Sequence, residues 1–394
     1  MTWHCISSLL AFLFAMPVFA QEAEDFGKEV GFAPDLASEP ETPPGLSELV
    51  KRGLQLKVAP YRPIHPSNGY MEATRRHQGT AVVVEGGSIR TPGLKGYVAG
   101  LPFPRPKTGL EVAWDMFYAY MGDDGWIRFR VHWVSKRRGV RRTEEWLWMY
   151  LTRATHRTDL SPLPDAATKG IQYASLARAE YPQDKRGTAA LFFRYEDPRD
   201  QTGFAFVPSM RRPLKMTFGA PGVPWNQTHM LFEDIRGYSG PVEWMEWRLL
   251  GQATILAPMH ANLPFGPEGR APYLDVPPYW NAPMEFEPRP VYVLEGRPRF
   301  WTSPYSRVVL YVDAESFLVP LKEGYDHKGR LFKVVLNAYN ESPDPSSQPA
   351  PLALALALDL ETGEATVFET METKANVGLT LKNFTEVELR RLGP

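Results

Sequence analysis

Residues 352–360 read LALALALDL, and this stretch decides the fold class. Successive side chains of a β-strand point to opposite faces of the sheet, so the stretch puts its leucines on one face and its alanines on the other. A leucine face with only small side chains behind it is typical of an antiparallel sheet with a thin second cover. The next residues, ETG at 361–363, predict a hairpin turn into a second strand over 365–370.

The same two-residue period recurs upstream of this hairpin. In 127–133 apolar residues alternate with Arg and His, KRRG at 136–139 predicts a turn, and a second strand passes through Trp146, Trp148 and Tyr150. Shorter strands are expected at 190–195, 204–207, 244–250, 291–295, 307–312, 317–321 and 330–338.

Helical spacing is confined to short segments. Over 108–120, apolar residues recur at steps of three and four behind Thr108, a suitable N-cap, and 385–392 predicts a closing helix capped by Thr385. No fixed-period repeat is found, which argues against propellers and solenoids. The pattern as a whole predicts an α+β, mainly β chain.

Composition narrows the class of protein. The 394 residues carry 44 Lys and Arg against 45 Asp and Glu, a formal net charge of −1, which argues against a nucleic-acid-binding protein. The mean hydropathy of −0.32 argues against a multi-span membrane protein. The 38 Pro, 31 Gly and 11 Trp indicate short strands joined by many turns.

Residues 1–20 predict a secretory signal peptide. A short apolar run precedes Val18 and Ala20, which suit the −3 and −1 positions of a cleavage site, and the run is too short to span a membrane. Cys5 lies inside this segment and Gln21 follows it, so the mature chain is expected to have no thiol and no lipid anchor. We expect a soluble periplasmic protein with a flexible acidic and Pro-rich lead-in over 21–45 and a single domain over 46–394.

Motifs for catalysis are scarce. No HExxH, P-loop or GxSxG pattern occurs and the His residues are scattered, so no metal and no cofactor are expected. Two carboxylates ~5–9 Å apart could hydrolyse a glycoside, with Asp124 and Glu145, or Glu233 and Glu246, as candidates. Adjacent carboxylates on a strand point to opposite faces, so no single acidic pair makes such a dyad. Solvated surface charges are the alternative.

Basic residues cluster at one predicted turn. Residues 136–142 hold five Lys and Arg, which either make a charged turn that resists aggregation or dock on anionic lipid head groups. A second basic pair, Arg211 and Arg212, lies between Pro208 and Pro213. The pair is either exposed, or buried where it binds backbone carbonyls or a ligand phosphate. The docking candidates are Arg137, Arg138, Arg141, Arg142, Arg211 and Arg212.

The tryptophans are the most unusual feature of the composition. Clustered aromatic side chains fill a core, or they line an apolar ligand cavity, and composition does not separate the two uses. The candidate lining residues are Trp114, Phe117, Trp133, Trp148 and Trp247.

Several longer motifs together resemble the bacterial envelope family catalogued as domain-of-unknown-function family 1329, over about residues 45–394. One departure is that PSMRRPLKM at 208–216 lacks a glycine of the family pattern and is less basic. The motifs that carry the resemblance are GLPFPRPKTGLEVAWD (100–115), YLTRATHR (150–157), RYEDPRDQTGFAFVPSMRRP (194–213), LFEDIRGYSGPVEWMEWRLLG (231–251), RPRFWTSPYSRVVLYVDAESFLVPLKEGYDHKGRLF (297–332) and FTEVELRRLGP (384–394).

The resemblance implies a fold similar to the lipoprotein carriers LolA and LolB. In that fold a large curved antiparallel sheet forms an incomplete barrel, with helices packed in its concave side. It also implies partnership with a resistance–nodulation–division-type exporter or an outer-membrane protein, and it supplies no catalytic residues. We therefore expect a non-enzymatic carrier for a lipid-like or other hydrophobic ligand, with peripheral membrane contact. An envelope hydrolase and a ligand-free scaffold are the alternatives.

Overall fold

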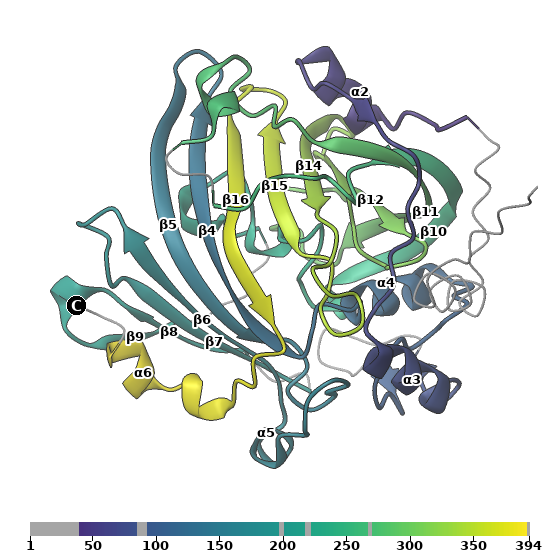
Figure 1. Cartoon of the computed structure of the whole chain (residues 1–394), viewed down its shortest axis with the longest axis vertical. Coiled ribbons are helices and arrows are strands. Elements are labelled where there is room, and N and C mark those ends of the chain that lie inside the picture. The colour runs from purple at the N-terminus through teal and green to yellow at the C-terminus, as the bar shows by residue number, and fades with distance from the viewer. Residues whose placement is uncertain (1–38, 85–92, 197–200, 217–221, 267–269, 392–394) are drawn as a thin grey trace, which may run out of the picture.

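The computed structural model describes residues 39–84, 93–196, 201–216, 222–266 and 270–391 (Figure 1). The predicted signal peptide and nearly all of the predicted lead-in lie outside these residues. The helices are α2 (Pro44–Lys51), α3 (Asn68–His77), α4 (Gly109–Phe117), α5 (Pro164–Lys169) and α6 (Glu386–Arg391), and short 3-10 turns are η1 (Pro208–Met210), η2 (Trp225–Gln227), η3 (Phe232–Asp234), η4 (Val242–Trp244), η5 (Pro272–Asp275) and η6 (Leu381–Asn383).

Fourteen of the described strands form one sheet, which curves strongly without closing into a barrel (Figure 1). Its order is β1-β11-β12-β13-β14-β15-β16-β4-β5-β6-β7-β8-β9, and β10 pairs with β11. The strands are β1 (Lys57–Val58), β2 (Val82–Val83), β3 (Leu94–Lys95), β4 (Asp124–Ser135), β5 (Gly139–Leu151), β6 (Ile171–Tyr181), β7 (Ala189–Tyr195), β8 (Thr202–Phe206), β9 (Pro213–Met216), β10 (Met245–Ala257), β11 (Glu285–Pro298), β12 (Arg307–Asp313), β13 (Leu321–Tyr325), β14 (Leu331–Tyr339), β15 (Leu352–Asp359) and β16 (Ala365–Ala375).

All pairings within this sheet are antiparallel except that of β1 with β11. The mainly β, open-sheet prediction is therefore confirmed. One pairing joins strands that are far apart in the sequence: β16, near the C-terminus, pairs with β4 along ten residues from Gly125 to Val134. This pairing joins the two halves of the sheet.

The stretch at 352–360 folds as its alternation predicts. Leu354, Leu356 and Leu358 point into the large core cluster, and Ala355 and Ala357 pack on the other face. Both faces of β15 are buried. The cover over the alanines is thin, because only small side chains separate the sheet from the segment that crosses it.

The strand predicted at 317–321 is wrong. The Asp313 carboxylate accepts the backbone N–H groups of Glu315 and Ser316 at 3.3 and 2.8 Å, which closes a turn after β12. Phe317 then has φ +57°, a left-handed backbone that ends any extended run. Strand β13 begins only at Leu321.

Strand β6 was not predicted from the sequence. Its apolar positions are mostly alanines, Ala174, Ala177 and Ala179, which have low strand propensity and give a weak alternation. Pairing along β5 and β7 holds the segment in the sheet despite that weak local signal.

Both predicted helices are present. The Thr108 hydroxyl accepts the Glu111 N–H, and the Glu111 carboxylate accepts the Thr108 N–H, so α4 begins with a complete capping box. Thr385 caps α6 through the Glu388 N–H at 3.1 Å. Helix α2 begins at Pro44, two residues before the expected domain boundary.

Residues 222–244 form an irregular segment, which we call the strap, that crosses one face of the sheet. Trp225 packs on Phe129, Trp146 and Phe368 with ring centroids 5.3–6.1 Å apart. Further along, Met230 covers the alanines of β15. We call the face that the strap crosses the inner face.

A buried ion pair fastens the middle of the strap to the sheet. Asp234 accepts from the Lys322 ammonium at 2.6 Å and from the Tyr305 hydroxyl at 2.8 Å, and the Lys333 ammonium lies 3.7 Å away. Burial raises the pKa of Asp234, but the two lysines outweigh it and hold that pKa below its usual range. The carboxylate therefore stays charged and paired inside the molecule.

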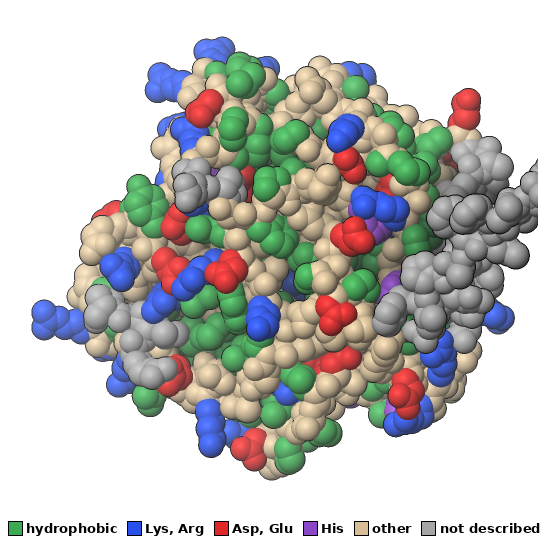
Figure 2. Space-filling view, in the orientation of Figure 1, with side chains coloured by type: hydrophobic (Ala, Val, Ile, Leu, Met, Phe, Trp, Pro, Cys, Tyr) green, Lys and Arg blue, Asp and Glu red, His purple; other side chains and the backbone are tan. Residues whose placement is uncertain are grey.

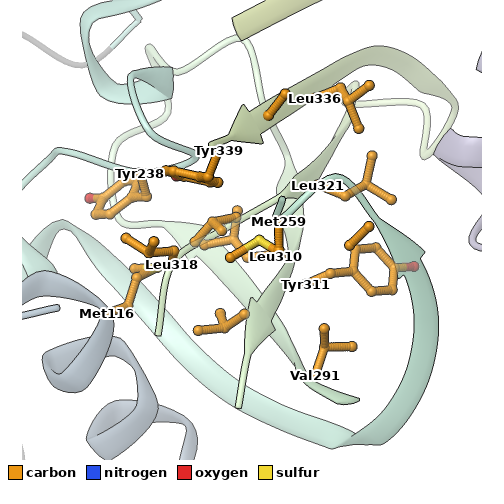
Figure 3. Packing of buried hydrophobic residues seen from close by; sticks show 14 of the residues in the cluster. Met116, Tyr238, Met259, Val291, Leu310, Tyr311, Leu318, Leu321, Leu336 and Tyr339 are labelled. Carbon is orange, nitrogen blue, oxygen red and sulfur yellow. The ribbon is translucent and has the colours of Figure 1, made fainter. Parts of the chain in front are cut away.

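Beyond this ion pair the strap packs into the main core. Figure 3 shows Tyr238 of the strap and Met116 of α4 converging on Leu318 and Tyr339. Gly237 has φ +89°, and a Cβ there would lie 2.5 Å from the Val319 side chain, so only glycine fits this close approach.

We expect Asp234→Asn to lower the free energy of unfolding by about 3–5 kcal/mol, because it leaves the Lys322 ammonium buried without a counter-charge. Denaturant unfolding measures the loss. The matched control is Asp326→Asn in the solvent-accessible ion pair with Arg330, for which a much smaller loss is expected because water screens that pair. Equal losses in the two variants would contradict the anchoring role.

Candidate functional site

The five predicted lining residues divide between two clusters. Trp114 and Phe117 lie on α4 with ring centroids 5.7 Å apart, and Trp247 of β10 packs on Tyr238 of the strap at 5.1 Å. Trp114 is buried in the main core with only 5% of it exposed, and Phe117 and Trp247 are partly buried against that core.

The other two predicted residues lie on the inner face of the sheet. Trp133 of β4 and Trp148 of β5 are half-buried around the strap residue Trp225. The indole N–H of Trp133 donates to the Gln227 carbonyl, whereas the buried Trp148 Nε1 has no hydrogen-bond partner. The five residues therefore do not line one common cavity.

A half-buried aromatic surface continues from Trp148 across β6 and β7. Register places Trp148 opposite Ala177, and Tyr173 opposite Arg194, all on the inner face. The Tyr173 and Phe192 rings lie 6.0 Å apart. We call the half-buried rings of Phe117, Trp148, Tyr173 and Phe192, together with the buried Tyr150, the aromatic platform.

Sequence analysis missed Tyr173 and Phe192. Tyr173 lies on β6, which was not predicted, so its face could not be assigned. Phe192 lies on β7 within the predicted strand 190–195, but without β6 beside it the face of Phe192 could not be related to that of Trp148. The signal that could have found them is the placement of large aromatics in a segment whose other inner-face positions are Ser175 and Ala177.

Helix α4 is held over this region by a close backbone approach. A Cβ on Gly109 would lie 2.5 Å from the Leu249 amide nitrogen of β10, so glycine allows the helix N-terminus to touch the strand. This contact directs Phe117, at the other end of the helix, toward Arg194, whose guanidinium carbon lies 5.6 Å from the Phe117 ring centroid.

Two cavities are lined by described residues away from the aromatic platform. One, of about 20 Å³ near Tyr70 and Tyr120, has room for a water molecule and not for an acyl chain. The other is an open groove of about 410 Å³ beside α2, floored by Leu331 and Phe332 and rimmed by charged side chains.

The candidate catalytic carboxylates do not meet. Asp124 pairs with Arg157 at 2.9 Å and Glu145 with Arg130 at 2.8 Å. Register puts Glu145 opposite Arg130, six residues from Asp124 along β4, a separation of about 20 Å that exceeds the reach of a glycosidase dyad.

The second candidate pair, Glu233 and Glu246, lies in two different environments. Glu246 is exposed on β10 beside Arg299, whereas Glu233 is buried in the strap with its Oε1 lacking a hydrogen-bond partner. Within the described ranges, no group of three or more His, Cys, Asp or Glu is placed to hold a metal ion.

The basic docking candidates lie at one end of the sheet. Because the strands are antiparallel, the turns β4–β5, β6–β7 and β8–β9 fall on the same edge. Figure 2 shows Lys and Arg side chains at the top of the β4–β5 hairpin and along the left edge of the molecule. The exposed candidates are Arg137, Arg138, Arg141, Arg211 and Arg212.

Arg142 differs from the other candidates. Its guanidinium pairs with the buried Glu144 carboxylate and lies 4.5 Å from the centroid of Trp133. Arg142 therefore packs on the inner face of the hairpin, and the exposed charges of this turn belong to Arg137, Arg138 and Arg141. The Arg211–Arg212 pair is exposed and does not hold buried carbonyls.

These features define a class: an open, curved antiparallel sheet whose inner face carries a half-buried aromatic surface. The fold resembles a candidate outer membrane lipoprotein-sorting protein domain from Vibrio parahaemolyticus, with 18% identity, 72% of this chain and 98% of that chain covered, and a TM-score of 0.51.

The chain belongs to the DUF1329 family of proteins of unknown function, whose model matches residues 39–390. A DUF1329 family protein from Desulfovibrio piger is 17% identical over 71% of this chain and 97% of that one, with a TM-score of 0.49. A LolA superfamily protein from Nitrosomonas europaea is 17% identical over 71% and 98%, with a TM-score of 0.42. A comparison with curated proteins gives no significant match. None of the helices in the described ranges is both long and apolar enough to cross a membrane.

Glu233 predicts a pH-dependent stability. Burial raises its pKa to about 6, so between pH 4.5 and 6 the folded protein binds a proton that the unfolded chain releases, and stability falls as the pH rises. We expect Glu233→Gln to stabilise the protein at pH 7.5 by about 2 kcal/mol and to change little at pH 4.

Thermal and denaturant unfolding at the two pH values measure this effect. Glu246→Gln, an exposed carboxylate on β10, is the control and should change stability by less than about 0.5 kcal/mol at both. The same gain for Glu233→Gln at pH 4 as at pH 7.5 would contradict a protonation effect.

Proposed function

We propose that this protein is a carrier that binds a lipid-like or other apolar molecule on its inner face. The observation that carries the proposal is the aromatic platform, whose large side chains Phe117, Trp148, Tyr173 and Phe192 stay half-buried beside α4. A ligand that covers them removes its own apolar surface and theirs from water. Each buried methylene contributes ~0.8 kcal/mol, so a dozen outweigh a moderate association cost.

The bound molecule would lie on the platform and not inside a sealed barrel. The cavity near Tyr70 is too small for it, and the strap fills the inner face over β14–β16. Secretion to the periplasm is part of the proposal and rests on the predicted signal peptide at 1–20. A resistance–nodulation–division-type exporter or an outer-membrane protein as partner rests on the family resemblance alone.

Ligand binding is tested with the fluorescent ester methyl cis-parinarate, an uncharged apolar probe. We expect saturable binding to the wild type and at least tenfold weaker binding to the double variant Trp148→Ala/Phe192→Ala, which removes two platform rings. The control is Trp301→Ala, because Trp301 is 89% exposed outside the platform. Native mass spectrometry of protein purified without detergent should also show a co-purified apolar molecule. Absence of saturable binding by the wild type would overturn the carrier function.

We also propose that the basic sheet end docks on an anionic membrane surface. The turns that carry Arg137, Arg138, Arg211 and Arg212 lie at the same end of the sheet, and Met210, next to Arg211, is 47% exposed. A basic side chain gains about 1 kcal/mol near an anionic leaflet, and an exposed methionine can enter the head-group layer.

Sedimentation with vesicles of phosphatidylglycerol and phosphatidylethanolamine tests the docking. Charge reversal of the four arginines to Glu should weaken binding at least tenfold, and the wild type should lose binding as salt rises. The matched control reverses Arg75 and Arg76, an exposed pair on α3. An equal loss of vesicle binding in the control would show that binding depends on net charge and not on the arginines at this end of the sheet.

A further inference from the structure

Arg194 projects from β7 onto the aromatic platform with few partners of its own. Its guanidinium lies 5.6 Å from the Phe117 ring centroid and 5.9 Å from that of Tyr173, and it donates one hydrogen bond to the Ser239 carbonyl at 2.8 Å. Its Nε is buried with no hydrogen-bond partner. Within the described ranges no carboxylate forms an ion pair with it.

Arg236 reaches the same platform from the strap. Its guanidinium lies 5.7 Å from the Tyr150 ring centroid and contacts the Met121 sulfur. A left-handed backbone, φ +57°, turns this residue out of the strap toward β5. Here too, no ion pair with a carboxylate is found among the residues that the structure describes.

The two arginines lie beside neighbouring rings of the platform. Tyr173 lies opposite Arg194, and Tyr150 lies opposite Ser175, two residues from Tyr173 on β6. Burial raises the pKa of Tyr173, and the hydrogen bond with Ser175 and the two guanidiniums oppose that rise. The patch therefore concentrates positive charge beside apolar rings.

Two other buried arginines have their charge paired with carboxylates, whereas the buried Arg153 donates to the Tyr118 and Ala119 carbonyls. Arg289 is fully buried and pairs with Asp313 at 2.7 Å, Glu315 at 2.7 Å and Glu287 at 3.2 Å. Arg157 is 3% exposed and pairs with Asp124. A charge withdrawn from water is costly unless it is paired.

We propose that Arg194 and Arg236 receive the anionic head of an amphiphile whose apolar chain lies on the aromatic platform. The inference rests on the proposed carrier function and narrows its ligand class to a long-chain carboxylate or phosphate monoester. The planar guanidinium of Arg194 offers its free Nε–H to one oxygen of such a head, while its ring contacts are kept. The Ser239 carbonyl orients the guanidinium from behind.

The test compares two probes that differ only in charge, cis-parinaric acid and its methyl ester, at pH 8. We expect wild-type protein to bind the acid at least tenfold more tightly than the ester. In Arg194→Gln/Arg236→Gln this preference should vanish, with ester binding within twofold of the wild type. Arg194→Lys, which keeps the charge but has no Nε–H, should retain only part of the preference.

Arg128→Gln is the matched control, because this arginine lies on β4 outside the platform, between Glu180 and Glu372. Its preference for the acid should equal that of the wild type. Displacement of bound parinaric acid by oleate or by oleoyl lysophosphatidic acid distinguishes a carboxylate head from a phosphate head, and either supports the proposal.

The outcomes separate the two proposals. If wild-type protein binds acid and ester equally, the anion site is overturned while the carrier function stands. If it binds neither, the carrier function fails first. Because the comparison of acid with ester is made in the wild type, it decides the question even if the double variant does not fold.

Discussion

The contact between the Asp234 carboxylate and the Lys322 ammonium is the interaction on which the inner face depends. The sheet is too wide for its few helices to cover, and the irregular strap covers part of it instead. Apolar packing alone fixes such a segment poorly, because it is not directional. A 2.6 Å ion pair, completed by the Tyr305 hydroxyl, fixes its position along the sheet.

The position of the strap divides the inner face into a closed part and a half-open part. Over β14, β15 and β16, Met230 and Trp225 lie directly on small or flat side chains, and no space remains. Past Arg236 the strap turns toward α4, and the rings of Trp148, Tyr173 and Phe192 stay half-buried. The closed core and the half-buried aromatic surface are thus two regions of one sheet face, separated by the path of the strap.

Charge is distributed between these regions in opposite ways. The Arg289 cluster with three carboxylates also accepts the Ile64 N–H through Glu315 at 2.7 Å, so it ties the N-terminal segment to the sheet. The positive charge of Arg289 is therefore fully paired within the fold. Arg194 and Arg236 contact rings, a carbonyl and a sulfur, and neither forms an ion pair with a carboxylate among the residues that the structure describes. We infer that this difference in pairing leaves Arg194 and Arg236 available to a ligand.

The sequence by itself determined the local elements, because a period of two or 3.6 residues and a capping pair are short-range properties. The alternation at 352–360, the hairpin at 136–139 and the Thr108 cap were all predictable. Only the tertiary structure decided which aromatic residues are core and which are half-buried, because periodicity assigns a side chain to a face without saying what covers that face. The strap, the Asp234–Lys322 pair 88 residues apart in sequence, and the two arginines without carboxylates arise from long-range contacts that no local pattern encodes.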